Sequence, residues 1–172
     1  RTIFNMLGPM TNPANVQNQV IGVFSAALCR PMAEVLKRLG SKHVLIVHAD
    51  VGLDEISISG KTFVAELKNN EITEYTVSAN DFGMAENSLE GLSVSSAEES
   101  LELIKSALGK ASDERSSKAR DIITLNAGAA IYASGLADTL AEGIDRAADA
   151  IGCGLALTKI ADLASFTRVF SS

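Results

Sequence analysis

The chain has 172 residues, a length that corresponds to a single domain with a sizeable core. Hydrophobic residues make up 47% and charged residues 21%, as in soluble globular proteins, and no apolar run approaches the roughly 18 residues that cross a bilayer. Fifteen basic against 21 acidic residues leave a net charge of -6, which disfavours nonspecific binding to nucleic acid or an anionic membrane. The two cysteines lack metal-ligand spacing and indicate packed, reduced thiols, so we expect a cytoplasmic protein.

Two strand-length apolar runs, with a helix between them, open the predicted fold. The runs at 19–25 and 43–48 are continuous, as expected for strands covered on both faces of a parallel sheet. The apolar residues between them recur at helical spacing, and Gly40 is placed to end that helix. They are Leu28, Met32, Val35, Leu36 and Leu39. This pattern predicts a right-handed βαβ unit.

A hairpin follows the βαβ unit. The runs 61–68 and 71–78 flank Asn69 and Asn70, two residues of a type that tolerates positive φ in a tight turn. Antiparallel strands are therefore added to the parallel pair. We expect an α/β fold class with a mixed, mainly parallel sheet and helices packed around it, and no linker divides the chain into two domains.

From residue 95 onward the sequence predicts helices. A serine–glutamate capping box within 95–99 starts one, and Gly109 is placed to end it. The segment 119–135 is apolar on nearly every side and rich in Ala and Gly, so we expect a buried helix in which Asn126 needs a hydrogen-bond partner. Two amphipathic helices complete the chain, the first opened by Thr139 with Glu142.

The loop at 5–13, "NMLGPMTNP", is the first candidate site. Its prolines, glycine and asparagines make an ordered loop with exposed backbone groups, suited to holding a small planar ligand. The alternative is a rigid connector between a helix and the first strand. Local chemistry leaves both interpretations open.

Asp54 and Glu55 form the second candidate site. Adjacent carboxylates without a nearby histidine or cysteine are hard oxygen ligands, which suit Mg²⁺ when waters and a phosphate complete its shell. A solvated surface is the alternative for any single Asp-Glu dipeptide. This pair, however, follows a predicted buried strand, and ligands gather at the carboxyl ends of strands in open α/β sheets.

Other motifs point away from hydrolysis and from dinucleotide binding. No serine lies in a G-x-S-x-G context, and no glycine-rich phosphate loop is present. His43 and His48 bracket a strand; packing or a hydrogen bond at the strand end is the expected role of His43, and His48 borders the acidic loop. We assign no catalytic residue in this sequence.

The sequence resembles the anthranilate phosphoribosyltransferase family in four motifs, which occur in the family's order across almost the whole chain. They are "RTIFNMLGPMTNPAN" at 1–15, the stretch at 22–57, "DFGM" at 81–84 and "LNAGAAIYASG" at 125–135. The resemblance covers the C-terminal half of the family's chain. It implies that residues 1–172 are the C-terminal part of the large α/β domain of phosphoribosyltransferase and nucleoside phosphorylase type.

The resemblance implies a reaction in which the amine of anthranilate displaces pyrophosphate from phosphoribosyl pyrophosphate. Asp54 and Glu55 match the family's acidic pair, which implies that they bind Mg²⁺ on the pyrophosphate. Gly8 and Pro9 match the loop that lines the anthranilate site, where they bind and orient the aromatic acid. It also implies a homodimer for the full-length chain.

The family's pyrophosphate loop and N-terminal helical domain are not in this sequence and are expected upstream of Arg1. We therefore expect the 172-residue chain to be inactive alone. Two alternatives remain. A nucleic-acid-binding paralogue is disfavoured by the acidic composition, and a pyrimidine nucleoside phosphorylase is disfavoured by the resemblance of "LGPMTNP" to the anthranilate loop.

Overall fold

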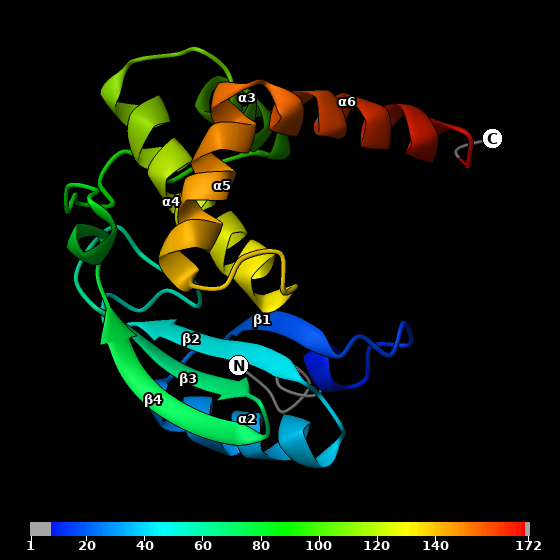
Figure 1. Ribbon diagram of the computed structural model, residues 1–172. Coiled ribbons are helices and arrows are strands. Elements are labelled where there is room, and N and C mark those ends of the chain that lie inside the picture. The colour runs from blue at the N-terminus through cyan, green and yellow to red at the C-terminus, as the bar shows by residue number, and fades with distance from the viewer. Residues whose placement is uncertain (1–7, 171–172) are drawn as a thin grey trace.

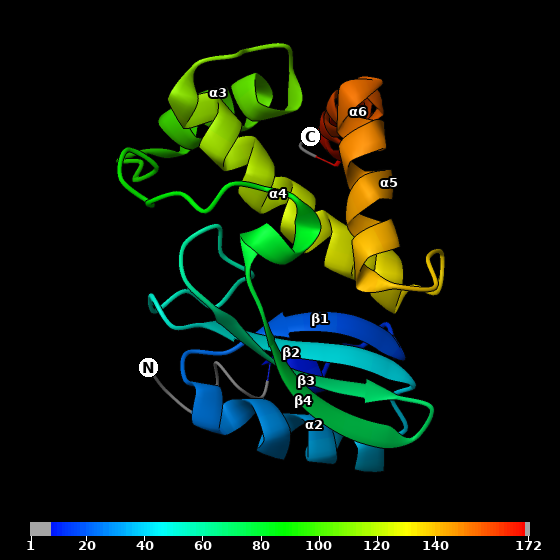
Figure 2. The same ribbon diagram turned by 60° about the vertical axis from the view of Figure 1, so that its left-hand side comes forward.

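The computed structural model describes residues 8–170 as one sheet between two layers of helices. Helix α2 (Cys29–Arg38) covers one face of the sheet, and helices α4 (Glu114–Ala133) and α5 (Leu140–Gly152) lie over the other (Figures 1 and 2). Residues 1–7, which open the motif at 1–15, lie outside the described residues.

The sheet contains four strands in the order β1-β2-β3-β4. Their bounds are Asn18–Gly22, His43–Ala49, Thr62–Lys68 and Glu71–Val77. The expected α/β class and mixed sheet are confirmed: β1 is parallel to β2, whereas β2/β3 and β3/β4 are antiparallel.

The described part of the sheet has fewer parallel pairs than the mainly parallel sheet that we expected. The reason lies in the connections. The loop between β2 and β3 carries no helix that could cross over the sheet, and parallel neighbours need such a crossover. The next connection is a two-residue hairpin, in which Asn69 and Asn70 adopt φ of 52° and 64° as predicted.

Helix α2 follows the short 3-10 helix η1 (Ala26–Leu28) and ends before Gly40, whose φ is +91°. The helix buries four residues against the sheet: Cys29, Met32, Ala33 and Leu36. Val35 and Leu39, which we placed on the apolar face, are exposed at the edge of the contact. Cys29 is packed as expected, but Cys153 is exposed after the end of α5.

The starts of the upper helices are fixed by capping residues. After the 3-10 helix η2 (Ala79–Phe82), helix α3 (Ala97–Leu108) begins at Ser96, whose Oγ accepts the Glu99 amide at 3.1 Å. Helix α5 begins in the same way at Thr139. The capping signals read from the sequence are thus confirmed.

Helix α6 (Leu155–Arg168) projects away from the rest of the molecule (Figure 1). Several of its large apolar side chains are exposed, among them Leu163 and Phe166. No single helix within residues 8–170 is long and apolar enough to cross a membrane; α5 and α6 reach that length and composition only together, across a bend of 72°.

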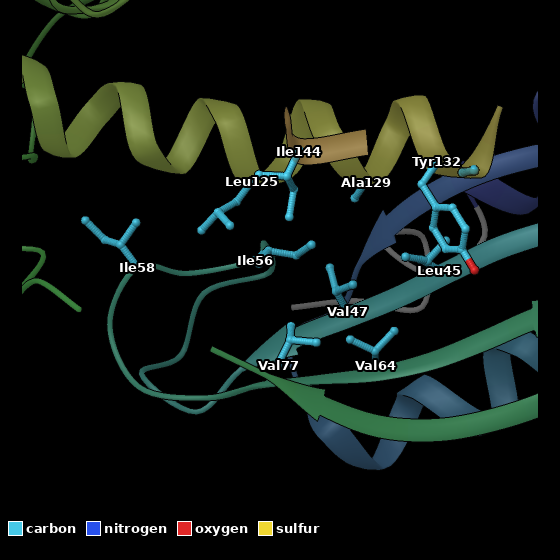
Figure 3. Packing of buried hydrophobic residues seen from close by; sticks show 11 residues of the cluster. Leu45, Val47, Ile56, Ile58, Val64, Val77, Leu125, Ala129, Tyr132 and Ile144 are labelled. Atoms are coloured by element: carbon cyan, nitrogen blue, oxygen red, sulfur yellow. The ribbon is translucent and has the colours of Figure 1, made fainter. Parts of the chain in front are cut away.

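Two apolar clusters, one on each face of the sheet, form the core. The cluster under α4 joins sheet residues such as Leu45 and Val47 to Leu125 and Ala129 of the helix (Figure 3). Ile56, from the loop after β2, belongs to the same cluster. The core thus connects the loop that carries Asp54 and Glu55 to both the sheet and α4.

Candidate functional site

A cavity of about 460 Å³ opens at the carboxyl ends of β1 and β2. Asp54 and Glu55 both line it, although neighbouring side chains on a strand would point to opposite faces. The loop after β2 therefore places both residues against one space. Strand and helix residues form the other walls: Val20, Gly22, Val47, Ile122, Ile123, Asn126 and Ala127.

Gly22 allows the acidic loop to lie directly on the end of β1. A methyl group added at this position would overlap the Asp54 carbonyl, so any larger residue would push the loop away. Gly22 could not be selected from the sequence, because a glycine at the end of a strand does not indicate which segment will pack on it.

Asn126 of α4 holds Ile56, the loop residue that follows Glu55. Its Nδ2 donates to the Ile56 carbonyl at 2.8 Å and to the Ile122 carbonyl at 3.0 Å, and its Oδ1 accepts the Ile56 amide at 2.9 Å. The predicted need of Asn126 for a partner is confirmed. A side-chain amide that pairs with both groups of one residue replaces a strand neighbour and fixes the loop beside Glu55.

The two carboxylates make the cavity a site of negative charge. Partial burial, together with the charge of Asp54, raises the pKa of Glu55. A cation between the two groups would relieve both effects. Within residues 8–170 no group of three or more His, Cys, Asp or Glu side chains could hold a metal, so a cation at this pair would need waters or a bound ligand to complete its shell.

Gly8 and Pro9 do not line this cavity. The next residue, Met10, packs against the apolar cluster on the α2 face, whereas the cavity lies on the α4 face. Residues 8–10 are helical, unlike the loop that we expected there. The hydroxyl and amide of Thr11 both donate to the Gly8 carbonyl at 3.3 Å, where this helical segment ends. The assignment of Gly8 and Pro9 to an anthranilate site stays a prediction.

The two histidines take structural positions. His43 contacts Glu66 at 2.8 Å at the start of β2, and the His48 Nδ1 lies 2.8 Å from the Val23 carbonyl at the end of β1. The hydrogen bond expected for His43 is confirmed. Neither histidine lines the acidic cavity.

Residues 1–157 match the family model described as the α/β domain of a glycosyl transferase family. The chain therefore belongs to this glycosyl transferase family. Its relatives include the anthranilate phosphoribosyltransferases of Cellvibrio japonicus and Hahella chejuensis, to which it is 62% identical over 168 residues and 61% identical over 170. These matches cover 98% and 99% of this chain and 49% of each relative, so the chain spans about half their length.

Solved structures agree with the sequence relatives. Anthranilate phosphoribosyltransferase from Thermus thermophilus is 34% identical, with a TM-score of 0.85 over 98% of this chain and 48% of that one. The enzyme from Saccharomyces cerevisiae, in complex with phosphoribosyl pyrophosphate and Mg, is 29% identical, with a TM-score of 0.78 over 92% and 45%. The resemblance predicted from the four motifs is confirmed.

Proposed function

We propose that the full-length protein containing this chain transfers the phosphoribosyl group of phosphoribosyl pyrophosphate to the amine of anthranilate, a step of tryptophan biosynthesis. The observation that carries the proposal is the convergence of Asp54 and Glu55 on one cavity at the carboxyl ends of the parallel strands β1 and β2. The relatives that share this chain at about 60% identity bear the name of that activity.

The reaction needs charge stabilisation more than a protein nucleophile. The amine nitrogen bonds to C1 of the ribose, the bond from C1 to the pyrophosphate oxygen breaks, and pyrophosphate leaves with that electron pair while the amine loses a proton. Mg²⁺, when bound, would neutralise the developing charge on the leaving group. Asp54 and Glu55 would hold the ion, and Asn126 would hold the loop that presents them.

The remaining parts of the proposal rest on the family resemblance. Gly8 and Pro9 would contact anthranilate through backbone and ring surfaces, which orients the acceptor amine. Residues 1–172 would form the C-terminal part of the large domain, in a cytoplasmic homodimer. The named relatives favour this transferase over the nucleic-acid-binding and nucleoside phosphorylase alternatives.

The test is the consumption of anthranilate by the full-length gene product, followed by the loss of anthranilate fluorescence. We expect a loss only when phosphoribosyl pyrophosphate and Mg²⁺ are both present. The control reactions replace the substrates with phosphate and a pyrimidine nucleoside. If anthranilate is unchanged and the nucleoside is cleaved, the transferase proposal is contradicted and a nucleoside phosphorylase is favoured.

A further inference from the structure

A buried polar cluster lies at the other end of β2 from the acidic cavity. Its centre is Glu66 of β3, which is 7% exposed. Glu66 Oε1 lies 2.8 Å from His43 Nε2 and accepts the Tyr132 hydroxyl at 2.7 Å, while Oε2 accepts the Tyr75 hydroxyl at 2.8 Å. Three polar side chains from three different elements, two of them hydroxyl donors, thus converge on one carboxylate.

Tyr132 is the residue that α4 contributes to this cluster. Its hydroxyl accepts a hydrogen bond from Lys68 Nζ at 3.1 Å while it donates to Glu66. The Lys68 ammonium lies 4.4 Å from the ring centroid, and the His43 ring packs edge-on at 4.6 Å. Figure 3 shows the Tyr132 side chain reaching from the helix toward the strands.

The protonation of the two tyrosines is secured by their surroundings. Burial, followed by the neighbouring Glu66, raises the pKa of Tyr75 and of Tyr132. Both hydroxyls therefore remain donors at neutral pH. The titratable groups that contact Glu66 are His43 of β2, Tyr75 of β4 and Tyr132 of α4, and Lys68 of β3 contacts Tyr132.

Helix α4 is consequently tied to the sheet layer by polar contacts at two points. Tyr132 bonds to Glu66, and six residues earlier, about 9 Å along the helix axis, Asn126 bonds to Ile56 beside the acidic pair. The contact between these points is apolar, through Ala129. Apolar contacts lack direction, whereas buried hydrogen bonds have a narrow geometry and are costly to leave unmade.

We propose that Glu66 and Tyr132 are positioning residues for the acidic site. The cluster fixes the position of α4 relative to the sheet. Through Asn126, α4 then fixes the position of the loop that carries Asp54 and Glu55. The effect of this positioning on catalysis rests on the proposed function, but the positioning of the loop does not.

The chain offers a matched pair of variants. Tyr132→Phe and Tyr75→Phe each remove one hydroxyl that donates to Glu66, and each keeps its ring. Only Tyr132 belongs to α4. In the full-length protein, amide exchange of the peptide containing Ile56 is followed by mass spectrometry. We expect about fivefold faster exchange in Tyr132→Phe, the factor of roughly one lost hydrogen bond, and no change in Tyr75→Phe.

Equal exchange rates in the two variants would overturn the positioning role, whether both rates change or neither does. This readout needs no turnover, so it gives its answer even if the full-length protein does not consume anthranilate.

The catalytic consequence is measured as the Mg²⁺ concentration at half-maximal anthranilate consumption. We expect Tyr132→Phe to raise this Mg²⁺ concentration about three- to tenfold. The increase should not exceed the roughly tenfold or larger loss of metal affinity caused by changing residues that contact metal ligands directly. Turnover at saturating Mg²⁺ should be nearly unchanged. Tyr75→Phe should match the wild type. A lower maximal rate in Tyr132→Phe at an unchanged Mg²⁺ requirement would contradict the proposal.

Discussion

Asp54 and Glu55 share a cavity in which their charges disfavour one another. Burial and the neighbouring Asp54 raise the pKa of Glu55 above its value of 4.5 in an unfolded chain. The folded state therefore binds the Glu55 proton more tightly than the unfolded state does. Above that raised pKa, ionisation of Glu55 lowers the free energy of unfolding. The negative charge of Glu55 therefore does not serve the stability of the fold.

Glu55→Gln should accordingly make the full-length protein more stable at neutral pH without Mg²⁺. The gain should shrink as the pH falls and vanish below about 4.5, because Glu55 is then protonated in both the folded and the unfolded state. Thermal unfolding of the variant and the wild type between pH 4 and 8 measures the difference. A variant that is less stable than the wild type at pH 7 would contradict this assignment.

Some residue roles follow from the sequence and others do not. Asp54 and Glu55 could be selected because their chemistry and their place after a buried strand are local facts. The need of Asn126 for a partner was also predictable, because a polar residue in a buried helix must form hydrogen bonds. Its partner, Ile56, lies 70 positions away in the chain, and no local pattern identifies such a pairing.

The contact between α4 and α5 depends on two glycines. A methyl group at Gly128 would meet the backbone of Ile144, and one at Gly143 would meet the Gly128 carbonyl. Neither obstacle is the flexible end of a side chain. The small residues that mark the buried helix in the sequence therefore allow its backbone to approach α5 closely.

Gly128→Ala should destabilise the full-length protein by about 1–3 kcal/mol, because the added methyl overfills a contact between two backbones. Gly152→Ala is the matched control: nothing lies within 4 Å of a methyl group there, so the substitution should be neutral or stabilising. Urea unfolding measures both. The account of this interface fails if Gly128→Ala is as stable as Gly152→Ala.

Elements were predicted well where their signals are local. The capping residues Ser96 and Thr139 and the hairpin turn at Asn69 and Asn70 act within a few positions of the backbone they fix. The direction of the strands was less predictable, because it depends on whether a connection crosses the sheet. The exposure of Val35 likewise depends on how far the sheet extends under α2.

Two features of the whole molecule bear on the proposed function. The chain spans about half the length of its curated relatives, and α6 exposes large apolar side chains such as Leu163 and Phe166. The Glu66 cluster joins the sheet to the helix layer above it, because its members come from β2, β3, β4 and α4.

The 172-residue chain alone should yield no product from anthranilate, phosphoribosyl pyrophosphate and Mg²⁺. The acidic pair supplies ligands for a cation, but the expected pyrophosphate loop is not in this sequence. Loss of anthranilate fluorescence, with the full-length protein as positive control, measures this directly. Product from the purified chain would show that these 172 residues carry a complete site.

The proposed metal site at Asp54 and Glu55 is tested by anthranilate consumption in the presence of Mg²⁺, measured for the full-length protein with each carboxylate replaced singly by its neutral amide. Asp54→Asn and Glu55→Gln should each lower kcat/KM by about 100-fold or more, since they remove proposed metal ligands rather than their supports. Asp50→Asn, an exposed neighbour that does not line the cavity, should match the wild type. Wild-type kcat/KM in both Asp54→Asn and Glu55→Gln would contradict the account, because the cavity would then not be the metal site.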